Sequence, residues 1–333
     1  MRSAILKSGK VEIVEKEIPT LKERYGAIIK VKACGLCGSD IVKINHSSPE
    51  VDKKTVLGHE IIGEIVDINT EIVGNGASEP FKKGDIIGMG HHFPCFNCKY
   101  CLHGNHSMCE GFKKTNIEPS GFSEYIFASD GHLKNTVFKK TDNISEEEFS
   151  FLEPLSCCVR AVRRAGLDFD KKNSSYNVLI LGLGSIGILM AQAAINTGAK
   201  VYGFDINKER QDFVKKYGVE FNPDIKYDII FMTSGSAKAI DTAIELIDVG
   251  GKIIVFSSIS KDFGYKNDDI YYKELTVMGS YSPAPIDLFT SYKLLTEKKV
   301  KVDGLSTKYP LDKINEAVSD TKMGKILKAY IEL

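Results

Sequence analysis

Residues 177–187 read NVLILGLGSIG, an apolar segment that runs directly into the spacing G-x-G-x-x-G. The first five of these residues predict a buried strand, and SIGILMAQAAI (185–195) predicts the helix that follows it. A lone G-x-G-x-x-G is a weak signal, but this strand–turn–helix context is typical of a dinucleotide-binding turn. The alternative, a glycine-rich turn without a ligand, fits this context less well.

The glycines of such a turn permit the turn itself, the close approach of a pyrophosphate, and close packing of the helix. The pyrophosphate would meet backbone N–H groups and the positive end of the helix that begins near Ser185. We therefore expect the cofactor to be bound by Gly182, Gly184, Ser185, Ile186 and Gly187.

Asp205 ends the next strand-like segment, VYGFD. Its carboxylate would accept hydrogen bonds from the adenosine ribose hydroxyls and would repel an added 2′-phosphate. Two unit charges about 4 Å apart interact by about 4 kcal/mol at an effective dielectric constant of about 20, before screening. This favours NAD over NADP. For Arg210 two interpretations stay open: stacking near the adenine, and a solvated helix residue.

Patterning divides the chain into two parts. From about residue 145 to residue 281, apolar strand-like segments alternate with helical segments, which predicts βαβ units and a doubly wound parallel sheet. Residues 1–140 read instead as short β-segments broken by glycines and polar turns. We predict an α/β protein of two domains: a β-rich catalytic domain of residues 1–145 and 284–333, and an NAD-binding Rossmann domain of residues 146–283.

Four cysteines, Cys95, Cys98, Cys101 and Cys109, have the spacing C-x2-C-x2-C-x7-C. Four thiolates so close in sequence can converge on one tetrahedral ion, and Zn²⁺ is the usual occupant. An all-cysteine shell leaves no open position, so this zinc would be structural, in a lobe of about residues 91–111. A [4Fe–4S] cluster is the competing interpretation, but the run lacks a Cys-Pro ending. A disulfide is less favoured, because nothing marks the chain as secreted.

Composition excludes several function classes. Lys plus Arg and Asp plus Glu balance at 44 each, so no basic excess attracts nucleic acid or an anionic membrane. No run of about 18 apolar residues exists to span a membrane. The opening residues lack the pattern of a signal peptide. Eight cysteines without such a signal indicate a reducing compartment, so we expect a cytoplasmic protein.

Three further motifs are scattered along the chain. Cys37 lies in CGLCGSD (34–40), His59 and Glu60 lie in GHEIIG (58–63), and Glu153 lies in LEPL (152–155). Taken singly, they read as a packed thiol, a core histidine and exposed carboxylates. Their spacing alone does not assemble them into a site.

Together with the four-cysteine run and the glycine-rich turn, these motifs resemble the zinc-dependent medium-chain dehydrogenase/reductase family over essentially the whole chain. The LEPL segment is more similar to the sorbitol and threonine dehydrogenase branch than to ethanol-active enzymes, which tend to carry a cysteine there. The resemblance implies a GroES-like fold for the β-rich domain. It also implies a homo-oligomer, with a tetramer favoured over a dimer.

The resemblance also implies a catalytic zinc held by Cys37, His59 and a carboxylate. In the family, Glu60 and Glu153 correspond to glutamates that exchange with water at this metal. We expect Glu60 in or at the edge of the ligand shell and Glu153 close enough to exchange with it. Cys157 and Cys158 are alternative ligands, although buried helix thiols suit their register better.

Other catalytic roles follow from the same resemblance. Ser39 matches the hydroxyl that passes the alcohol proton away from zinc, and Asp40 matches a carboxylate that orients the ligating imidazole. Many members have a histidine where this chain has Val42, so the proton path beyond Ser39 is left open.

Two histidines precede the cysteine lobe. In threonine dehydrogenases a histidine three residues before the first lobe cysteine reaches the substrate pocket, and His92 holds that place, with Phe93 beside it. We expect His92 and Phe93 to contact the substrate. A third metal site at His91 and His92, and a pair of surface histidines, are the alternatives.

We conclude that the sequence predicts an NAD-dependent zinc dehydrogenase that oxidises a small-molecule secondary alcohol, namely a polyol, sugar or cyclitol. Zinc lowers the pKa of the hydroxyl, and hydride then passes to the nicotinamide. A threonine 3-dehydrogenase or a simple alcohol dehydrogenase is the alternative within this class. A non-catalytic or zinc-free nucleotide-binding relative is the alternative outside it, and the joint presence of Cys37, His59 and the four-cysteine run argues against it.

Two complete ligand sets predict two zinc ions per chain, which elemental analysis would measure. Replacing Cys98 should unfold the lobe or break assembly, because structural zinc contributes folding free energy. Replacing Cys37 should abolish turnover while the fold is kept. One zinc per chain, or iron, in carefully prepared protein would contradict this assignment.

Overall fold

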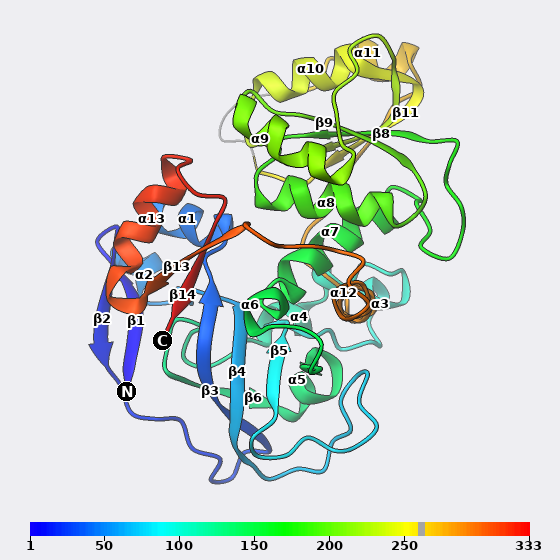
Figure 1. Cartoon of the computed structure of the whole chain (residues 1–333). Coiled ribbons are helices and arrows are strands. Elements are labelled where there is room, and N and C mark those ends of the chain that lie inside the picture. Colours follow the sequence, from blue (N-terminus) through cyan, green and yellow to red (C-terminus); the bar gives the residue numbers. More distant parts are fainter. Residues whose placement is uncertain (259–263) are drawn as a thin grey trace. The chain divides into compact units, whose positions relative to one another are not determined.

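The computed structural model describes residues 1–258 and 264–333 (Figure 1). The chain divides into two compact units, one of Met1–Glu153 with Pro283–Leu333 and one of Pro154–Ser282. None of the helices in the described part of the chain is long and apolar enough to cross a membrane.

The first boundary lies eight residues later than the sequence suggested. Residues after 145 stay with the first unit because their side chains and backbone are bound there. Lys32 Nζ pairs with Glu146 at 2.7 Å, and Lys298 Nζ pairs with Glu148 at 2.8 Å. Ser291 Oγ donates to the Leu152 carbonyl at 2.8 Å. Periodicity alone does not reveal such long-range contacts.

A seven-stranded sheet forms the first unit, in the order β13-β14-β3-β4-β5-β7 with β6 also paired to β3. All pairs are antiparallel except β13 with β14. The strands are β3 (Gly26–Gly35), β4 (Glu60–Ile68), β5 (Ile86–Met89), β6 (Tyr125–Ser129), β7 (Val137–Lys139), β13 (Ser306–Pro310) and β14 (Lys328–Glu332). A separate hairpin joins β1 (Arg2–Lys7) to β2 (Lys10–Glu15).

The α-helices of the first unit are α1 (Gly38–Asn45), α2 (Pro49–Asp52), α3 (Lys99–Leu102), α4 (Glu110–Lys114), α5 (Asp130–Asn135), α6 (Glu146–Phe149), α12 (Pro285–Thr296) and α13 (Ile314–Lys322). The apolar core includes Ile29, Ile61, Ile87, Phe122 and Ile331. Because Ile331 lies on β14, the last strand, this core packs the C-terminal end of the chain against strands from its first third.

The second unit is a five-stranded parallel sheet in the order β12-β11-β10-β8-β9. Its strands are β8 (Asn177–Leu181), β9 (Lys200–Phe204), β10 (Tyr227–Met232), β11 (Ile247–Val255) and β12 (Thr276–Gly279). Its helices are α7 (Leu152–Arg164, which starts in the first unit), α8 (Ser185–Ile195), α9 (Lys208–Val214), α10 (Lys238–Leu246) and α11 (Asn267–Tyr272). Figure 1 shows α8 on one side of this sheet and α10 and α11 on the other. The predicted α/β class, with a β-rich part and a parallel-sheet Rossmann part, is confirmed.

Each glycine of the turn between β8 and α8 has its own structural role. Gly182 has φ +100°, which favours glycine, and its carbonyl accepts a 2.7 Å hydrogen bond from Thr233 Oγ1. A Cβ at Gly187 would lie 1.9 Å from the Gly182 carbonyl oxygen. A Cβ at Gly184 would meet nothing within 4 Å, so this position opens onto free space at the start of α8.

We predict opposite outcomes for two alanine variants in this turn. Gly187→Ala should destabilise the protein, because helix and turn must separate to admit the methyl group. Gly184→Ala should fold normally and bind NADH at least about 10-fold more weakly, because its methyl group would occupy the place of the pyrophosphate. Thermal unfolding and fluorescence titration with NADH measure the two effects. Equal NADH affinity in Gly184→Ala and wild type would contradict this division.

Candidate functional site

The four lobe cysteines converge in the structure. Cys95 follows β5 in a loop, Cys98 precedes α3, Cys101 lies within it, and Cys109 precedes α4. Their sulfur atoms lie 3.4 Å (95–109), 3.6 Å (98–101) and 4.0 Å (95–101) apart. A tetrahedral ion with metal–sulfur distances of about 2.3 Å requires sulfur separations of about 3.8 Å. The lobe therefore fits a structural zinc, and none of its cysteines forms a disulfide.

The surroundings of the lobe cysteines also shift the pKa values of their thiols. Burial opposes ionisation of Cys109, but N–H groups of Cys95 and Phe112 overcome it and lower the pKa of this thiol to about 6. Burial raises the pKa of Cys101 to about 12. One sulfur is thus ready to bind a cation, and the lobe must release further protons as a metal binds.

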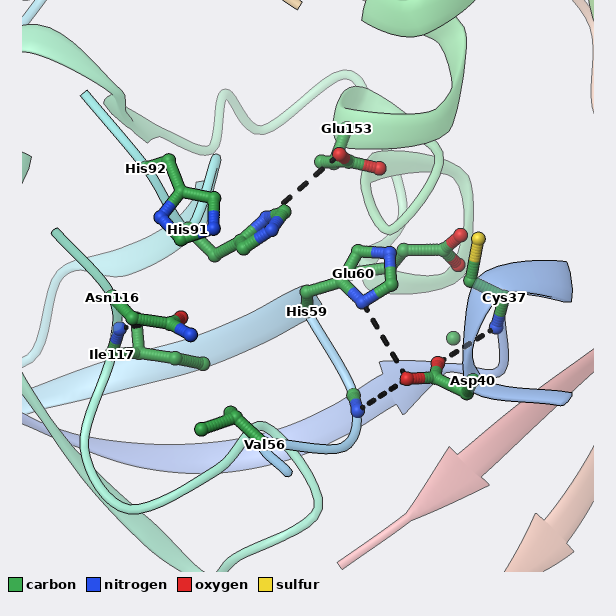
Figure 2. A network of polar contacts seen from close by, with 12 residues as sticks. Cys37, Asp40, Val56, His59, Glu60, His91, His92, Asn116, Ile117 and Glu153 are labelled. Atoms are coloured by element: carbon green, nitrogen blue, oxygen red, sulfur yellow. Dashed lines mark hydrogen bonds and ion pairs between the residues drawn. The ribbon is translucent and has the colours of Figure 1, made fainter. Parts of the chain in front are cut away.

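A second ligand group lies at the ends of β3 and β4. Cys37 immediately precedes α1, while His59 and Glu60 stand at the start of β4. In the register of β3 with β4, Gly35 faces Glu60, and this brings the two motifs together. One ligand atom from each of Cys37, His59 and Glu60 lies within 4.8 Å of the others (Figure 2). A thiol, an imidazole and a carboxylate at such distances are the donor set of a catalytic zinc with an open position.

Asp40 fixes the two loops that carry these ligands. Its carboxylate is completely buried and accepts hydrogen bonds from Cys37 N at 3.1 Å and Gly58 N at 3.0 Å. Its Oδ1 lies 3.7 Å from His59 Nδ1, which is beyond hydrogen-bond distance. His59 therefore turns Nδ1 toward Asp40, and its other ring nitrogen lies on the side of Glu60 (Figure 2).

Ser39 and Cys37 meet on the first turn of α1. Burial raises the pKa of the Cys37 thiol to about 11, and a hydrogen bond with Ser39 opposes this shift. Val42, two residues after Asp40, is 48% exposed and contributes no titratable group. Ser39 thus lies beside Cys37, but Val42 cannot carry the proton any further.

Lys328 belongs to this site, and the sequence analysis missed it. It lies on β14, where Tyr330 faces Gly35 of β3, and it pairs with both carboxylate oxygens of Glu60. Glu60 is fully buried and Lys328 is 7% exposed. Burial alone disfavours the ammonium, but the Glu60 carboxylate raises the pKa of Lys328. The available signal was a lysine inside the apolar segment ILKAYI.

Gly35 is required by this arrangement. A Cβ at this position would lie 2.0 Å from Glu60 Oε2. Among the described residues, Oε2 is also a buried oxygen without a hydrogen bond, although it lies against the Lys328 ammonium. The Lys328 ammonium is the cation that balances this oxygen.

Glu153 and His91 stand at the edge of the ligand group. Glu153 is buried at the start of α7, and its Oε1 lies 3.9 Å from His91 Nδ1 (Figure 2). Burial raises the pKa of Glu153 to about 7. The His91 and His59 rings are 4.6 Å apart between centroids. Glu153 is thus next to the site, but its oxygens do not lie within the close group of Cys37, His59 and Glu60.

His92 and Phe93 contact residues outside the group of Cys37, His59 and Glu60. His92 Nδ1 contacts the Thr115 carbonyl oxygen, and its ring lies 4.9 Å from that of Phe112. Phe93 packs edge-on against His132, with ring centroids 4.9 Å apart. These two side chains, which the sequence predicted as substrate contacts, pack against residues of the cysteine lobe and of α5, while His91 lies beside His59.

The dinucleotide turn is supported by Asp205. Its Oδ2 accepts from Leu183 N at 2.7 Å, and its Oδ1 accepts from Asn207 N at 2.8 Å. Each carboxylate oxygen keeps a second lone pair, which a ribose hydroxyl can use. Arg210 Nη1 lies 3.6 Å from the same carboxylate, so its nearest charged partner is Asp205.

Two more cysteines follow Glu153 on α7. Cys158 is buried, and its thiol donates to the Ile186 carbonyl at 3.6 Å. Neither Cys157 nor Cys158 lies in the ligand groups found among the described residues. This agrees with their interpretation as helix thiols.

The ion pair of Glu60 and Lys328 makes a testable prediction. Lys328→Met should lower the free energy of unfolding by about 3–5 kcal/mol, because it leaves a buried carboxylate unpaired. The double variant Lys328→Met/Glu60→Gln should recover most of this loss. Urea unfolding measures both.

Lys325→Met is the matched control. Lys325 pairs with Asp320 at 3.0 Å at an exposed position, so its loss should cost less than about 1 kcal/mol. If Lys328→Met is as stable as Lys325→Met, the buried pair does not form in solution.

Comparison with known proteins identifies the family. The alcohol dehydrogenase GroES-like domain matches residues 23–138, and the zinc-binding dehydrogenase domain matches residues 185–297. Together these models match more than half of the chain.

Relatives match along nearly the whole length. Galactitol 1-phosphate 5-dehydrogenase of Escherichia coli is 29% identical over 89% of both chains. Probable D-xylulose reductase A of Aspergillus fumigatus is 27% identical over 96% of this chain and 93% of its own. The crystal structure of galactitol-1-phosphate dehydrogenase from Escherichia coli covers 100% of both chains with a TM-score of 0.82 and 26% identity. The chain therefore belongs to the zinc-dependent medium-chain dehydrogenase/reductase family, and it is an oxidoreductase whose cofactors are zinc and NAD.

Proposed function

We propose that the protein oxidises a secondary alcohol group of a polyol, sugar or cyclitol to the ketone and reduces NAD⁺ to NADH. The observation that carries this proposal is the ligand group of Cys37, His59 and Glu60 bordered by the polar side chains of His91 and Glu153. A ligand set with an open position suits an alcohol oxygen, and polar neighbours suit a substrate with several hydroxyl groups.

The chain's own residues have separate tasks in this proposal. When bound by Cys37, His59 and Glu60, zinc would act as a Lewis acid toward the alcohol hydroxyl. From its position beside Cys37, Ser39 would relay the proton that this hydroxyl loses: its oxygen receives that proton while its own proton passes to solvent. Lys328 holds Glu60, and Glu153 would exchange with Glu60 through water.

The names of relatives support the substrate class. One is named for galactitol 1-phosphate and another for D-xylulose, both of which carry several hydroxyl groups. A simple alcohol would leave the polar wall at His91 unused. A threonine dehydrogenase is less favoured, because His92, one of the residues that suggested it, is turned to Thr115.

We further propose a cytoplasmic homo-oligomer, a tetramer in preference to a dimer. No disulfide links the eight cysteines, which suits a reducing compartment. In the second unit β12 is an edge strand, and Tyr271 and Tyr272 nearby are 71% and 77% exposed. An edge strand presents unpaired backbone N–H and C=O groups with which a second chain can pair, and light scattering would give the subunit number.

A substrate panel tests the proposed reaction. With NAD⁺, NADH absorbance should report turnover of polyols or cyclitols at a kcat/KM at least about 10-fold above that for threonine or a simple alcohol. NADP⁺ should be the poorer cofactor. Activity confined to simple alcohols, or preference for NADP⁺, would refute the corresponding part of the proposal.

Asp205→Asn isolates the cause of the cofactor choice. It keeps an acceptor for Leu183 N while it removes the charge, so NAD⁺ preference over NADP⁺ should fall by about 10-fold or more. Asp212→Asn, on α9 and paired with Lys215, is the control and should leave the preference unchanged. An unchanged preference in Asp205→Asn would place this carboxylate away from the ribose.

A further inference from the structure

His91 is a polar group whose ring packs against other histidines while its ring nitrogens, within the described residues, make no hydrogen bond to protein. Its imidazole lies between the rings of His59 and His92, at centroid distances of 4.6 Å and 4.1 Å. Its Nδ1 is 3.9 Å from Glu153 Oε1, which is too long for a hydrogen bond. Within residues 1–258 and 264–333, neither of its ring nitrogens is hydrogen-bonded to protein.

The backbone of His91 is held in place by another histidine. His132 Nε2 donates to the His91 carbonyl at 3.1 Å, because His132 Nδ1 accepts from Ser129 N at 3.3 Å and so leaves the proton on Nε2. His91 therefore keeps its place beside His59 without using its own ring nitrogens.

Asn116 offers a second neutral polar group on the same side. Its Oδ1 accepts a 2.9 Å hydrogen bond from Ile117 N, which fixes the amide. The two N–H donors of its Nδ2 remain for a ligand. Figure 2 shows the Asn116 amide pointing toward the side where His59 and His91 lie.

We propose that His91 and Asn116 hydrogen-bond a hydroxyl group on the carbon next to the one that is oxidised, so that the enzyme selects vicinal diols over simple alcohols. This inference rests on the proposed function and names the residues that determine its specificity. A substrate without the second hydroxyl leaves both groups desolvated and unpaired, and sites built around a substrate hydroxyl reject such analogues strongly. His91 and Asn116 act on the substrate and leave the metal ligands unchanged.

The test compares two substrates of one carbon skeleton, 2,3-butanediol and 2-butanol, in the zinc-loaded enzyme with NAD⁺. The wild type should prefer the diol in kcat/KM. His91→Phe and Asn116→Leu should each lower this preference about 10-fold or more, because the diol loses a hydrogen bond that 2-butanol never makes. His91→Gln, which keeps a donor and an acceptor, should recover part of the preference. His103→Phe, at an exposed histidine of the cysteine lobe, is the control and should match the wild type.

A binding measurement separates recognition from chemistry. The complex of enzyme with NADH cannot oxidise a diol, so the rise in its unfolding temperature with added 2,3-butanediol reports binding alone. This rise should be lost in His91→Phe, with zinc content and NADH affinity as in the wild type.

Three outcomes would overturn the inference. If the variants lose activity on both alcohols equally, or lose zinc, His91 supports the metal site and does not read the substrate. If the diol preference is unchanged in both variants, other residues determine it. If the wild type holds zinc and binds NADH but oxidises neither alcohol nor any polyol, the proposed function fails, and the inference fails with it.

Discussion

The buried ion pair of Glu60 and Lys328 constrains the rest of the first unit. An ammonium and a carboxylate withdrawn from water are tolerated only when they remain together. Lys328 must therefore arrive on β14 in the register that sets Tyr330 opposite Gly35, and Gly35 must lack a side chain. The last strand of the chain thus positions a ligand that stands near its beginning.

The two metal sites differ in how they depend on the fold. The cysteine lobe takes its four ligands from one stretch of 15 residues and its own small core of Cys101, Cys109 and Phe112. Its geometry can form locally, so its spacing was enough to predict it. The second group needs the β3–β4 register and the Asp40 bridge, which is why motif resemblance was required to assemble it.

The sequence predicts the structure correctly where apolar residues recur at a regular interval or where the residues of a motif have a fixed spacing. Alternating strands and helices gave the parallel sheet, and the glycine spacing gave the turn before α8. It failed in the loop after β5, where no period shows which of His91 and His92 faces His59. It also missed Lys328, since partners 268 residues apart leave no local pattern. The domain boundary lies later than the sequence suggested for the same reason, because residues 146–152 are held in the first unit by partners far away in the sequence.

A common principle connects the polar residues of both units. One atom or face of each side chain is bound by the protein, and another is left for a ligand. Asp205 accepts from Leu183 N and keeps lone pairs, and Asn116 accepts from Ile117 N and keeps two donors. Such internal bonds hold a side chain in its working orientation before the ligand arrives, which lowers the entropy lost on binding. A structural hydrogen bond at these residues is therefore compatible with a functional one, and it is the reason that the functional one can be selective.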